Sequence, residues 1–309
     1  MRIGTIRNAV PAAAGRLCLC LLILLASVSN GWAREIIATD QRGREIHLAH
    51  PPERIVTLAP SITEIVFYLG LGDRVAGVTR FSDYPPEAGL KPKVGAFTDL
   101  NVERIITLAP DLVLGTKNGN RPGAVRLMEG AGLTVFILDT KDLEGVLTTL
   151  VTVGRLGGIA DTARRMAGEL EQRVDHIRRK VRSEPKPKVF FQVNPRPIMT
   201  INHETFLHDL ISLAGGSNIA ADAPIKYPRF SIEEVIQQKP EVIIIAGMKQ
   251  GPQLDEARRR WMTLPLIPAV KNDRVHLIDS DLTNRPSPRI VQGLEILARL
   301  IHPEIQWDE

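Results

Sequence analysis

The sequence predicts an α/β fold of two lobes, each with a small central parallel sheet flanked by helices, joined by one long rigid helix, with a ligand cleft between the lobes. A recurring segment is the first observation: residues 101–115, NVERIITLAPDLVLG, return in altered form as residues 231–247, SIEEVIQQKPEVIIIAG. Each copy has a helix N-cap residue, a Pro-acid dipeptide and an aliphatic run, typical of a short helix feeding a buried parallel strand. The second observation is the proline-free stretch 161–182 between the copies.

Two other segments, 54–61 (RIVTLAPS) and 104–111 (RIITLAPD), match more closely letter for letter. Their contexts differ, because the first leads into Ser61-Ile62-Thr63-Glu64, a pattern typical of a capping box that starts a helix. The second begins three places after an N-cap. We therefore predict a strand for the first and a helix for the second, and the match between them is a coincidence.

The composition is that of a globular protein large enough for two cores. The chain has 309 residues, of which 44% are hydrophobic and 24% charged. The formal net charge of +4 includes Arg2, Arg7 and Arg16, which lie in a segment expected to be removed, so about +1 remains. The sequence has no basic helix face and no interleaving of aromatic and basic residues, so it does not indicate nucleic-acid binding.

Residues 1–33 have the pattern of a cleavable secretory signal peptide, in which the arginines precede an apolar stretch and small residues precede the cleavage site. A membrane anchor is disfavoured because the apolar core is short for a span of about 17–25 residues. Cys18 and Cys20 both lie inside this stretch, and neither has the lead-in of a lipoprotein anchor. The mature protein is therefore expected to be periplasmic and free of cysteine.

Residues 34–157 are predicted to form the N-terminal lobe. Apolar runs bounded by glycine and proline indicate its elements. These are a hairpin at 36–48 around Gly43, strands at 55–59, 75–79, 94–97 and 135–138, helices at 62–69, 124–129 and 143–154, a proline loop at 82–86, and the first copy of the repeat.

Residues 158–184 are predicted to hold the linking helix, since apolar residues keep helical spacing over 161–182. A helix of about 22 residues is roughly 33 Å long and does not bend like a short crossover, so we expect limited lobe closure. Residues 185–309 are predicted to form the C-terminal lobe. Its elements are strands at 189–193 and 275–278, helices at 206–214, 254–264 and 289–301, and the second copy of the repeat.

Five motifs are spaced along both predicted lobes. They are IVTLAP at 55–60, SDYPP at 82–86, NVERI at 101–105, PDLV at 110–113, and Ser280-Asp281 followed by Arg285 and SPRI at 287–290. Together they resemble the periplasmic substrate-binding proteins of the helical-backbone type, which serve ABC importers of metal chelates. The cobalamin-binding members are the most similar, although sequences with these motifs serve several chelates.

The resemblance implies an exported, monomeric, non-catalytic receptor that captures a cobalt corrinoid and delivers it to an ABC permease, with no intrinsic cofactor. A ferric siderophore or haem is the alternative ligand. A periplasmic hydrolase of the same shape is a weaker alternative, because the sequence contains no nucleophile elbow, HExxH or GxGxxG motif.

Glu103 and Glu233 occupy equivalent places in the two copies, two residues after each N-cap. An acid there stabilises a helix through its macrodipole by about 0.3–1 kcal/mol. The resemblance adds that both glutamates dock onto arginines of the permease, one from each lobe.

The ligand site implied by the resemblance consists of aromatic residues and of polar groups for the edge of the chelate. The candidates are Phe81, Tyr84, Phe97, Tyr227, Arg229, Asp281 and Arg285. Asp281 and Arg285 can also pair with each other, and Arg289 is assigned to structure. One departure counts against cobalamin: Thr116 stands where the cobalamin-binding relatives have a large aromatic residue.

The seven histidines do not indicate a bare metal site. His203 and His208 are five residues apart at a loop-helix junction, which is not the spacing of a helical metal pair. Contact of His203 or Tyr84 with a haem iron stays an alternative.

Overall fold

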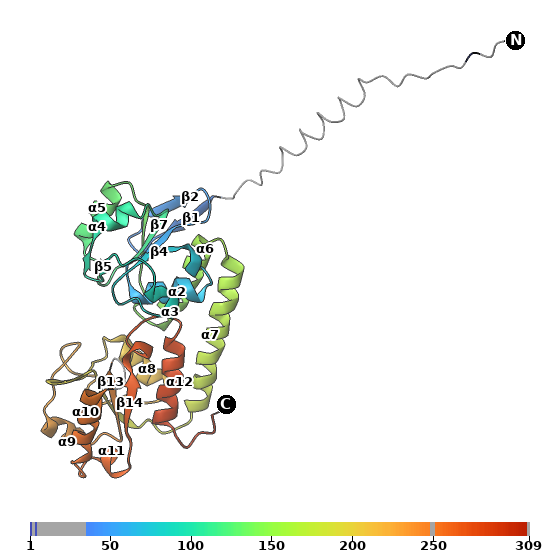
Figure 1. Ribbon diagram of the computed structural model, residues 1–309. Helices are drawn as coiled ribbons and strands as arrows, with labels where there is room; N and C mark the ends of the chain where they lie inside the picture. Colours follow the sequence, from blue (N-terminus) through green and yellow to red (C-terminus); the bar gives the residue numbers. More distant parts are fainter. Residues whose placement is uncertain (2–3, 5–34, 248–250, 308–309) are drawn as a thin grey trace.

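The computed structural model describes residues 1, 4, 35–247 and 251–307, so the predicted signal peptide lies almost entirely outside the described residues. Two α/β lobes stand one above the other, and the long helix α7 (Ala160–Val181) runs beside both of them (Figure 1). Each lobe contains a four-stranded parallel sheet flanked by helices. The predicted fold class is confirmed.

The N-terminal lobe is built on a sheet of order β4-β3-β7-β8. Its strands are β3 (Ile55–Thr57), β4 (Val75–Val78), β7 (Leu112–Thr116) and β8 (Val135–Leu138). The larger helices are α2 (Pro60–Tyr68), α4 (Val102–Thr107), α5 (Pro122–Gly130) and α6 (Leu143–Leu156). Smaller elements are the hairpins β1 (Ile36–Thr39) with β2 (Glu45–Leu48) and β5 (Gly95–Ala96) with β6 (Asp99–Leu100), and α3 (Pro86–Gly89).

The C-terminal lobe is built on a sheet of order β12-β9-β13-β14. Its strands are β9 (Lys188–Gln192), β12 (Ser217–Asn218), β13 (Val242–Gly247) and β14 (Val275–Asp279). Its helices are α8 (Phe206–Leu213), α9 (Ile232–Gln238), α10 (Pro252–Met262), α11 (Pro268–Lys271) and α12 (Ile290–Ile301). The hairpin of β10 (Asn194–Pro195) and β11 (Ile198–Met199) completes it. In both lobes the first strand lies between the second and the third, so the two sheets share one topology.

The recurring segment forms α4 and β7 in one lobe and α9 and β13 in the other, as predicted. The N-cap side chains of Asn101 and Ser231 accept hydrogen bonds from backbone N–H groups in the first turn of their helices. After each helix, the residue before the proline has a positive φ, 43° at Ala109 and 51° at Lys239. The two copies therefore share a beginning, an ending and a place in the sheet.

The two octapeptide segments also form different structures, as their contexts predict: residues 55–57 form strand β3 and residues 102–107 form helix α4. The predicted capping box at Ser61 and Glu64 is wrong. Helix α2 begins at Pro60, its N-cap is Ala59, and no side chain caps it. Proline at the first helical position presets φ and replaces the cap, and Glu64 instead turns inward and is 3% exposed.

Helix α7 binds the lobes together through its buried stripe. Ala163, Ala167, Leu170, Val174, Ile177 and Val181 are buried, at the positions that the helical spacing predicts. The helix packs against α6 of the N-terminal lobe and α12 of the C-terminal lobe. One hydrophobic cluster therefore continues from Phe136 in one sheet to Phe191 in the other.

Candidate functional site

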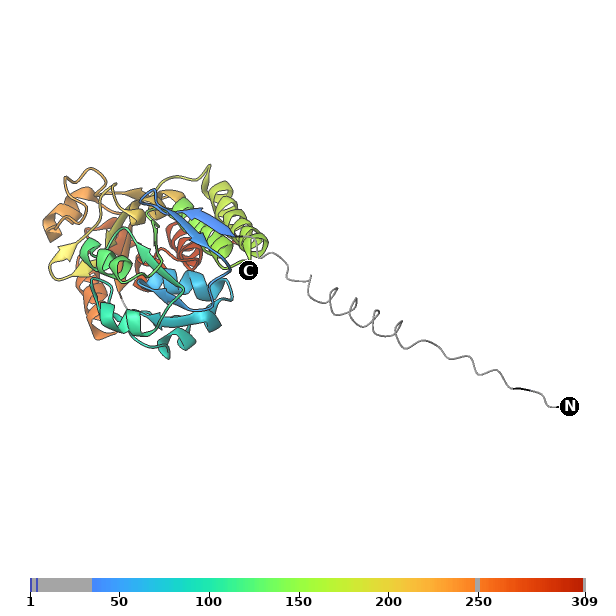
Figure 2. The same cartoon turned by 90° about the horizontal axis from the view of Figure 1, so that it is seen from above.

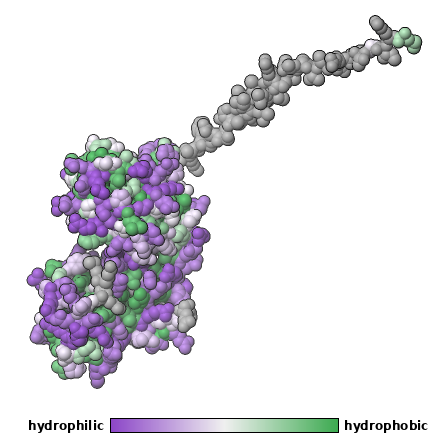
Figure 3. Space-filling model, in the orientation of Figure 1, coloured by the Kyte–Doolittle hydropathy of each residue, from purple (hydrophilic) through white to green (hydrophobic). Residues whose placement is uncertain are grey.

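A cleft of about 540 Å³ lies between the lobes, where the carboxyl ends of several parallel strands point. Such ends are where ligands bind in open parallel sheets. Figure 3 shows the surface hollowed between the upper and lower lobes. The residues that line this inter-lobe cleft are Ala59, Pro60, Ser61, Phe97, Thr116, Asn118 and Thr140 of the N-terminal lobe, and Val193, Thr205, Phe206, Leu207, Tyr227, Thr283, Asn284, Arg285 and Pro286 of the C-terminal lobe.

The lining of the cleft is nearly uncharged. Arg285 is its one ionised side chain among the lining residues, and the polar remainder consists of hydroxyl groups and the amides of Asn118 and Asn284. Phe97, Phe206 and Tyr227 supply aromatic surface, and Tyr227 is 51% exposed. Aromatic faces with scattered neutral hydrogen-bonding groups suit a large organic ligand.

Asn120 holds the wall that carries Phe97. Its Nδ2 donates to the carbonyl oxygens of Leu58 and Phe97, each at 3.0 Å, and its Oδ1 accepts from the Thr116 amide at 2.8 Å. Gly119 has a φ of +130° and lies so close to the Phe97 ring that a Cβ atom there would be 1.9 Å from Cζ. Only glycine at position 119 therefore allows the Phe97 ring to occupy this position in the cleft wall.

Arg285 is held by carboxylates from both lobes. Its Nε lies 3.0 Å from Asp281 Oδ1, and its Nη1 lies 2.9 Å from Asp83 and 3.3 Å from Glu64. Burial raises the pKa of the Asp281 carboxyl, and the Arg285 charge opposes that shift. The positive charge of Arg285 is thus offset before any ligand enters.

Three of the predicted ligand residues, Phe97, Tyr227 and Arg285, line the cleft together. Asp281 is not among the lining residues and pairs with Arg285, as the alternative of their mutual pairing predicts. Tyr84 lies elsewhere, with its ring 3.7 Å from the Arg289 guanidinium.

The other two predicted ligand residues are not among those that line the cleft. Phe81 is 57% exposed, and Arg229 is exposed, with its backbone bridged to Met199. Nor is His203, whose Nδ1 lies 2.7 Å from the Ala221 carbonyl oxygen.

Several lining residues were missed by the sequence reasoning, notably Asn118, Thr140, Phe206 and Asn284. Asn118 and Thr140 lie two residues after the ends of β7 and β8, and Phe206 begins α8. A search of the residues that follow each predicted strand would have found the first two. Glu64 was also missed, because its local pattern indicates a cap.

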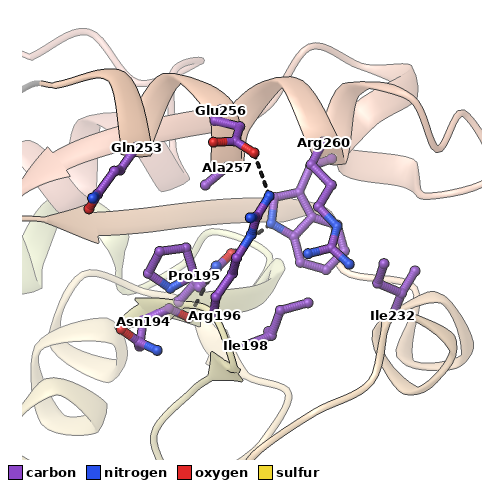
Figure 4. A pocket seen from close by; sticks show the side chains of 11 residues that line it. Asn194, Pro195, Arg196, Ile198, Ile232, Gln253, Glu256, Ala257 and Arg260 are labelled. Atoms are coloured by element: carbon purple, nitrogen blue, oxygen red, sulfur yellow. Dashed lines mark hydrogen bonds and ion pairs between the residues drawn. The ribbon is translucent and has the colours of Figure 1, made fainter.

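Hollows also lie outside the inter-lobe cleft. The rear cavity, of about 510 Å³, is lined by Glu64, Phe67, Tyr68, Tyr84, Pro85, Leu170, Arg173, Pro288, Arg289, Gln292 and Glu295. A pocket of about 340 Å³ in the C-terminal lobe lies between the β10-β11 hairpin and α10 (Figure 4). In this pocket Arg196 forms an ion pair with Glu256, so each of these two charges already has a partner. Trp261 donates a hydrogen bond to Gln192 at 2.7 Å. The inter-lobe cleft is larger and is built by both lobes.

Glu103 on α4 and Glu233 on α9 are both exposed. Their helices lie on the side of the molecule away from α7 in both ribbon views (Figures 1 and 2). Each lobe therefore carries one of these exposed helices on the side opposite the linking helix.

Neither a metal site nor a membrane span emerges from the described residues. They contain no group of three or more His, Cys, Asp and Glu side chains that could hold a metal ion. No helix within the described part of the chain has the length and apolar character needed to cross a membrane.

Comparisons with known proteins agree with this architecture. Residues 55–282 match the model of the periplasmic binding protein family. The vitamin B12-binding protein of Vibrio cholerae serotype O1 is 32% identical over 245 residues, covering 79% of this chain and 87% of that protein. The crystal structure of periplasmic vitamin B12 binding protein BtuF of Vibrio cholerae is 31% identical, with a TM-score of 0.73, covering 82% of this chain and 98% of the other.

A second similar structure is the periplasmic haem-binding protein RhuT from Roseiflexus sp. RS-1 in its apo form. It is 29% identical, with a TM-score of 0.70, and the match covers 82% of this chain and 99% of that one. The extent of these matches shows that this chain belongs to the periplasmic binding protein family, which confirms the resemblance drawn from its motifs. A binding-protein role follows, with a permease as the class of partner that the family implies.

Proposed function

We propose that this protein is an exported, non-catalytic receptor that captures a corrinoid of the cobalamin type in the inter-lobe cleft and delivers it to an ABC permease from the periplasm. The observation that carries the choice of ligand is the neutral lining of the cleft. Hydroxyl and amide groups surround three aromatic rings, and the charge of Arg285 is offset by Asp83, Asp281 and Glu64.

The neutral lining favours a ligand whose edge carries amides over one that carries carboxylates. A corrinoid presents neutral amide oxygens, which can accept from Arg285 and from the side-chain amides. Haem propionates or an anionic siderophore would bring further negative charge towards the carboxylates around Arg285, and like charges in a partly desolvated site repel. Thr116, the departure from the cobalamin-binding relatives, adds a hydroxyl to the same neutral wall.

Haem is the second candidate, and one observation favours it. Tyr227 lines the cleft and is half exposed, and a tyrosine oxygen is a known axial ligand of haem iron. The haem-binding relative described above has the same fold. If haem is the ligand, we infer that Tyr227, rather than His203 or Tyr84, approaches the iron, because of these three residues Tyr227 is the one that lines the cleft.

Delivery is assigned to Glu103 and Glu233, which present one carboxylate from each lobe on the same side of the molecule. A monomer with matched acids on two similar lobes suits a permease with two-fold symmetry. The proposal assigns no chemical turnover to the protein.

Calorimetric titration of the chain from Arg34 onward tests the ligand. Cyanocobalamin is expected to bind one to one, and with an affinity that changes little between low and high salt, because a neutral ligand is not screened. Haemin and a ferric siderophore are titrated in parallel. If cyanocobalamin gives no binding heat and haemin binds with an affinity that depends on salt, the proposed ligand is haem and not a corrinoid.

A further inference from the structure

Glu64 is a buried carboxylate that joins the two lobes. It lies on α2 of the N-terminal lobe and is 3% exposed. All of its side-chain hydrogen bonds within the described residues come from the segment between β14 and α12 of the other lobe. Ser287 Oγ donates at 2.6 Å, Arg289 donates through Nε at 2.8 Å and Nη2 at 2.6 Å, and Arg285 Nη1 donates at 3.3 Å.

The donors and two further carboxylates form a charged cluster around Glu64. Arg289 grips it with a fork of two hydrogen bonds, the geometry in which guanidinium and carboxylate bind best. Arg285 shares its charge between Glu64 and Asp83 of the N-terminal lobe and Asp281 of its own lobe. Two of the three carboxylates that orient Arg285 therefore belong to the opposite lobe.

The cluster lies between two hollows. Ser61, one helical turn before Glu64, and Arg285 line the inter-lobe cleft. Glu64 itself and Arg289 line the rear cavity. The lobes are thus joined here by charged hydrogen bonds, with the inter-lobe cleft on one side of the cluster and the rear cavity on the other. Figure 1 shows the segment between β14 and α12 reaching up to the other lobe at this level.

We propose that Glu64 is a positioning residue that sets the spacing of the lobes and aims Arg285 into the cleft. Ligand affinity then depends on a side chain that does not line the cleft. Without the Glu64 charge, the half-buried Arg289 guanidinium loses the carboxylate that it grips, and Arg285 loses one of its three carboxylate partners. Both side chains are then expected to shift, because a partly buried charge is unfavourable once its partner is removed. The part of the proposal that concerns affinity rests on the proposed function, whereas the part that concerns lobe spacing does not.

Lobe spacing is measured with spin labels on the unliganded protein. The chain has cysteine only at positions 18 and 20, so the protein from Arg34 onward accepts new cysteines without interference. Leu127→Cys on the N-terminal lobe and Leu266→Cys on the C-terminal lobe replace side chains that are 66% and 81% exposed. Double electron-electron resonance is expected to give a single narrow distance, which Glu64→Gln broadens and shifts.

Glu295→Gln is the matched control. Glu295 also binds an arginine through two hydrogen bonds of 2.8 Å, but that arginine is Arg173 on α7. This pair joins α12 to the linking helix and does not cross between the lobes, so its loss is expected to leave the distance unchanged. If Glu64→Gln also leaves it unchanged, the proposal is wrong.

Affinity is measured with cyanocobalamin as the probe in a double-mutant cycle. Glu64→Gln and Arg285→Lys are each expected to weaken binding about tenfold, the cost of one unsatisfied polar group. The double variant is expected to lose little more than either single variant, because Glu64 acts through Arg285. Fully additive losses would refute that route of action.

The two measurements separate two kinds of failure. If the unaltered protein does not bind cyanocobalamin, the corrinoid proposal fails, and the spin-label distances still decide the role of Glu64 in spacing the lobes. If Glu64→Gln does not fold, Ser287→Ala takes its place, since it removes a single donor from the same carboxylate. A broader distance distribution supports the proposal, and an unchanged one overturns it.

Discussion

At the scale of single residues, the shape of the cleft depends on the absence of a side chain at Gly119 as well as on the side chains that line it. The Phe97 ring lies over Gly119, where no side chain stands in its way. Because the backbone of Gly119 also has a positive φ, two separate constraints select glycine there.

Gly119→Ala is predicted to push Phe97 out of the cleft wall and to weaken binding of the ligand about tenfold, the equivalent of roughly 1.4 kcal/mol of aromatic contact. Titration calorimetry with the ligand identified as above measures this. The control is Gly123→Ala on α5, where an added Cβ meets nothing within 4 Å. It is expected to leave affinity unchanged and to raise stability by about 0.5–1 kcal/mol. Equal affinity of both variants would contradict the prediction.

At the scale of elements, the two copies of the repeat use the same device to begin a helix, with different completeness. Asn101 caps α4 through its side chain alone, whereas Ser231 and Glu234 form a reciprocal capping box on α9. Hydrogen bonds from Ser231 lower the pKa of the Glu234 carboxyl. The acid that the resemblance assigns to docking, Glu233, lies between these two residues and is left free to face outward.

Ser231→Ala is predicted to lower the free energy of unfolding by about 1 kcal/mol, since it leaves helix N–H groups without their acceptor. Urea denaturation followed by circular dichroism measures the change. Ser183→Ala, at an exposed position after α7, is the control and is expected to stay within about 0.5 kcal/mol of the unaltered protein. If Ser231→Ala lowers the free energy of unfolding no more than Ser183→Ala does, the capping box does not stabilise α9.

At the scale of the whole molecule, the surfaces that we propose for ligand binding and for docking to the permease are separate. The cleft lies between the lobes, and Glu103 and Glu233 lie on exposed helices, one in each lobe. Substitutions at the two glutamates should therefore leave the cleft intact.

The variant with both Glu103→Ala and Glu233→Ala is predicted to bind the ligand normally and to associate with its permease at least about tenfold more weakly, as expected when charged contacts of an interface are lost. Association with the permease in nanodiscs, followed at two salt concentrations, measures this. Glu171→Ala, which removes an exposed acid of α7, is the control. Undiminished association of the double variant would disprove the docking role.

Local sequence patterns were enough to predict most of the elements. Period, caps and prolines located the strands β8 and β13, the stripe of α7, and the two copies of the repeat, because these signals arise between residues close in the chain. Context also separated β3 from α4 despite their similar letters. The membership of Phe97, Tyr227 and Arg285 in a site came from the resemblance, not from any local pattern.

What only the tertiary structure decided is which distant residues meet. Ser61 and Glu64 have the local pattern of a cap, yet Glu64 is buried because Arg285, Ser287 and Arg289 come to it from the far end of the chain. In the same way, the contact between the Tyr84 ring and the Arg289 guanidinium joins residues that are far apart in the chain. The sequence by itself determined the elements and the two-lobed plan. The neutrality of the cleft and the charged hydrogen bonds between the lobes were decided by the tertiary structure. A buried charge is stable only beside a partner, and the packing of the fold determines which residues become partners.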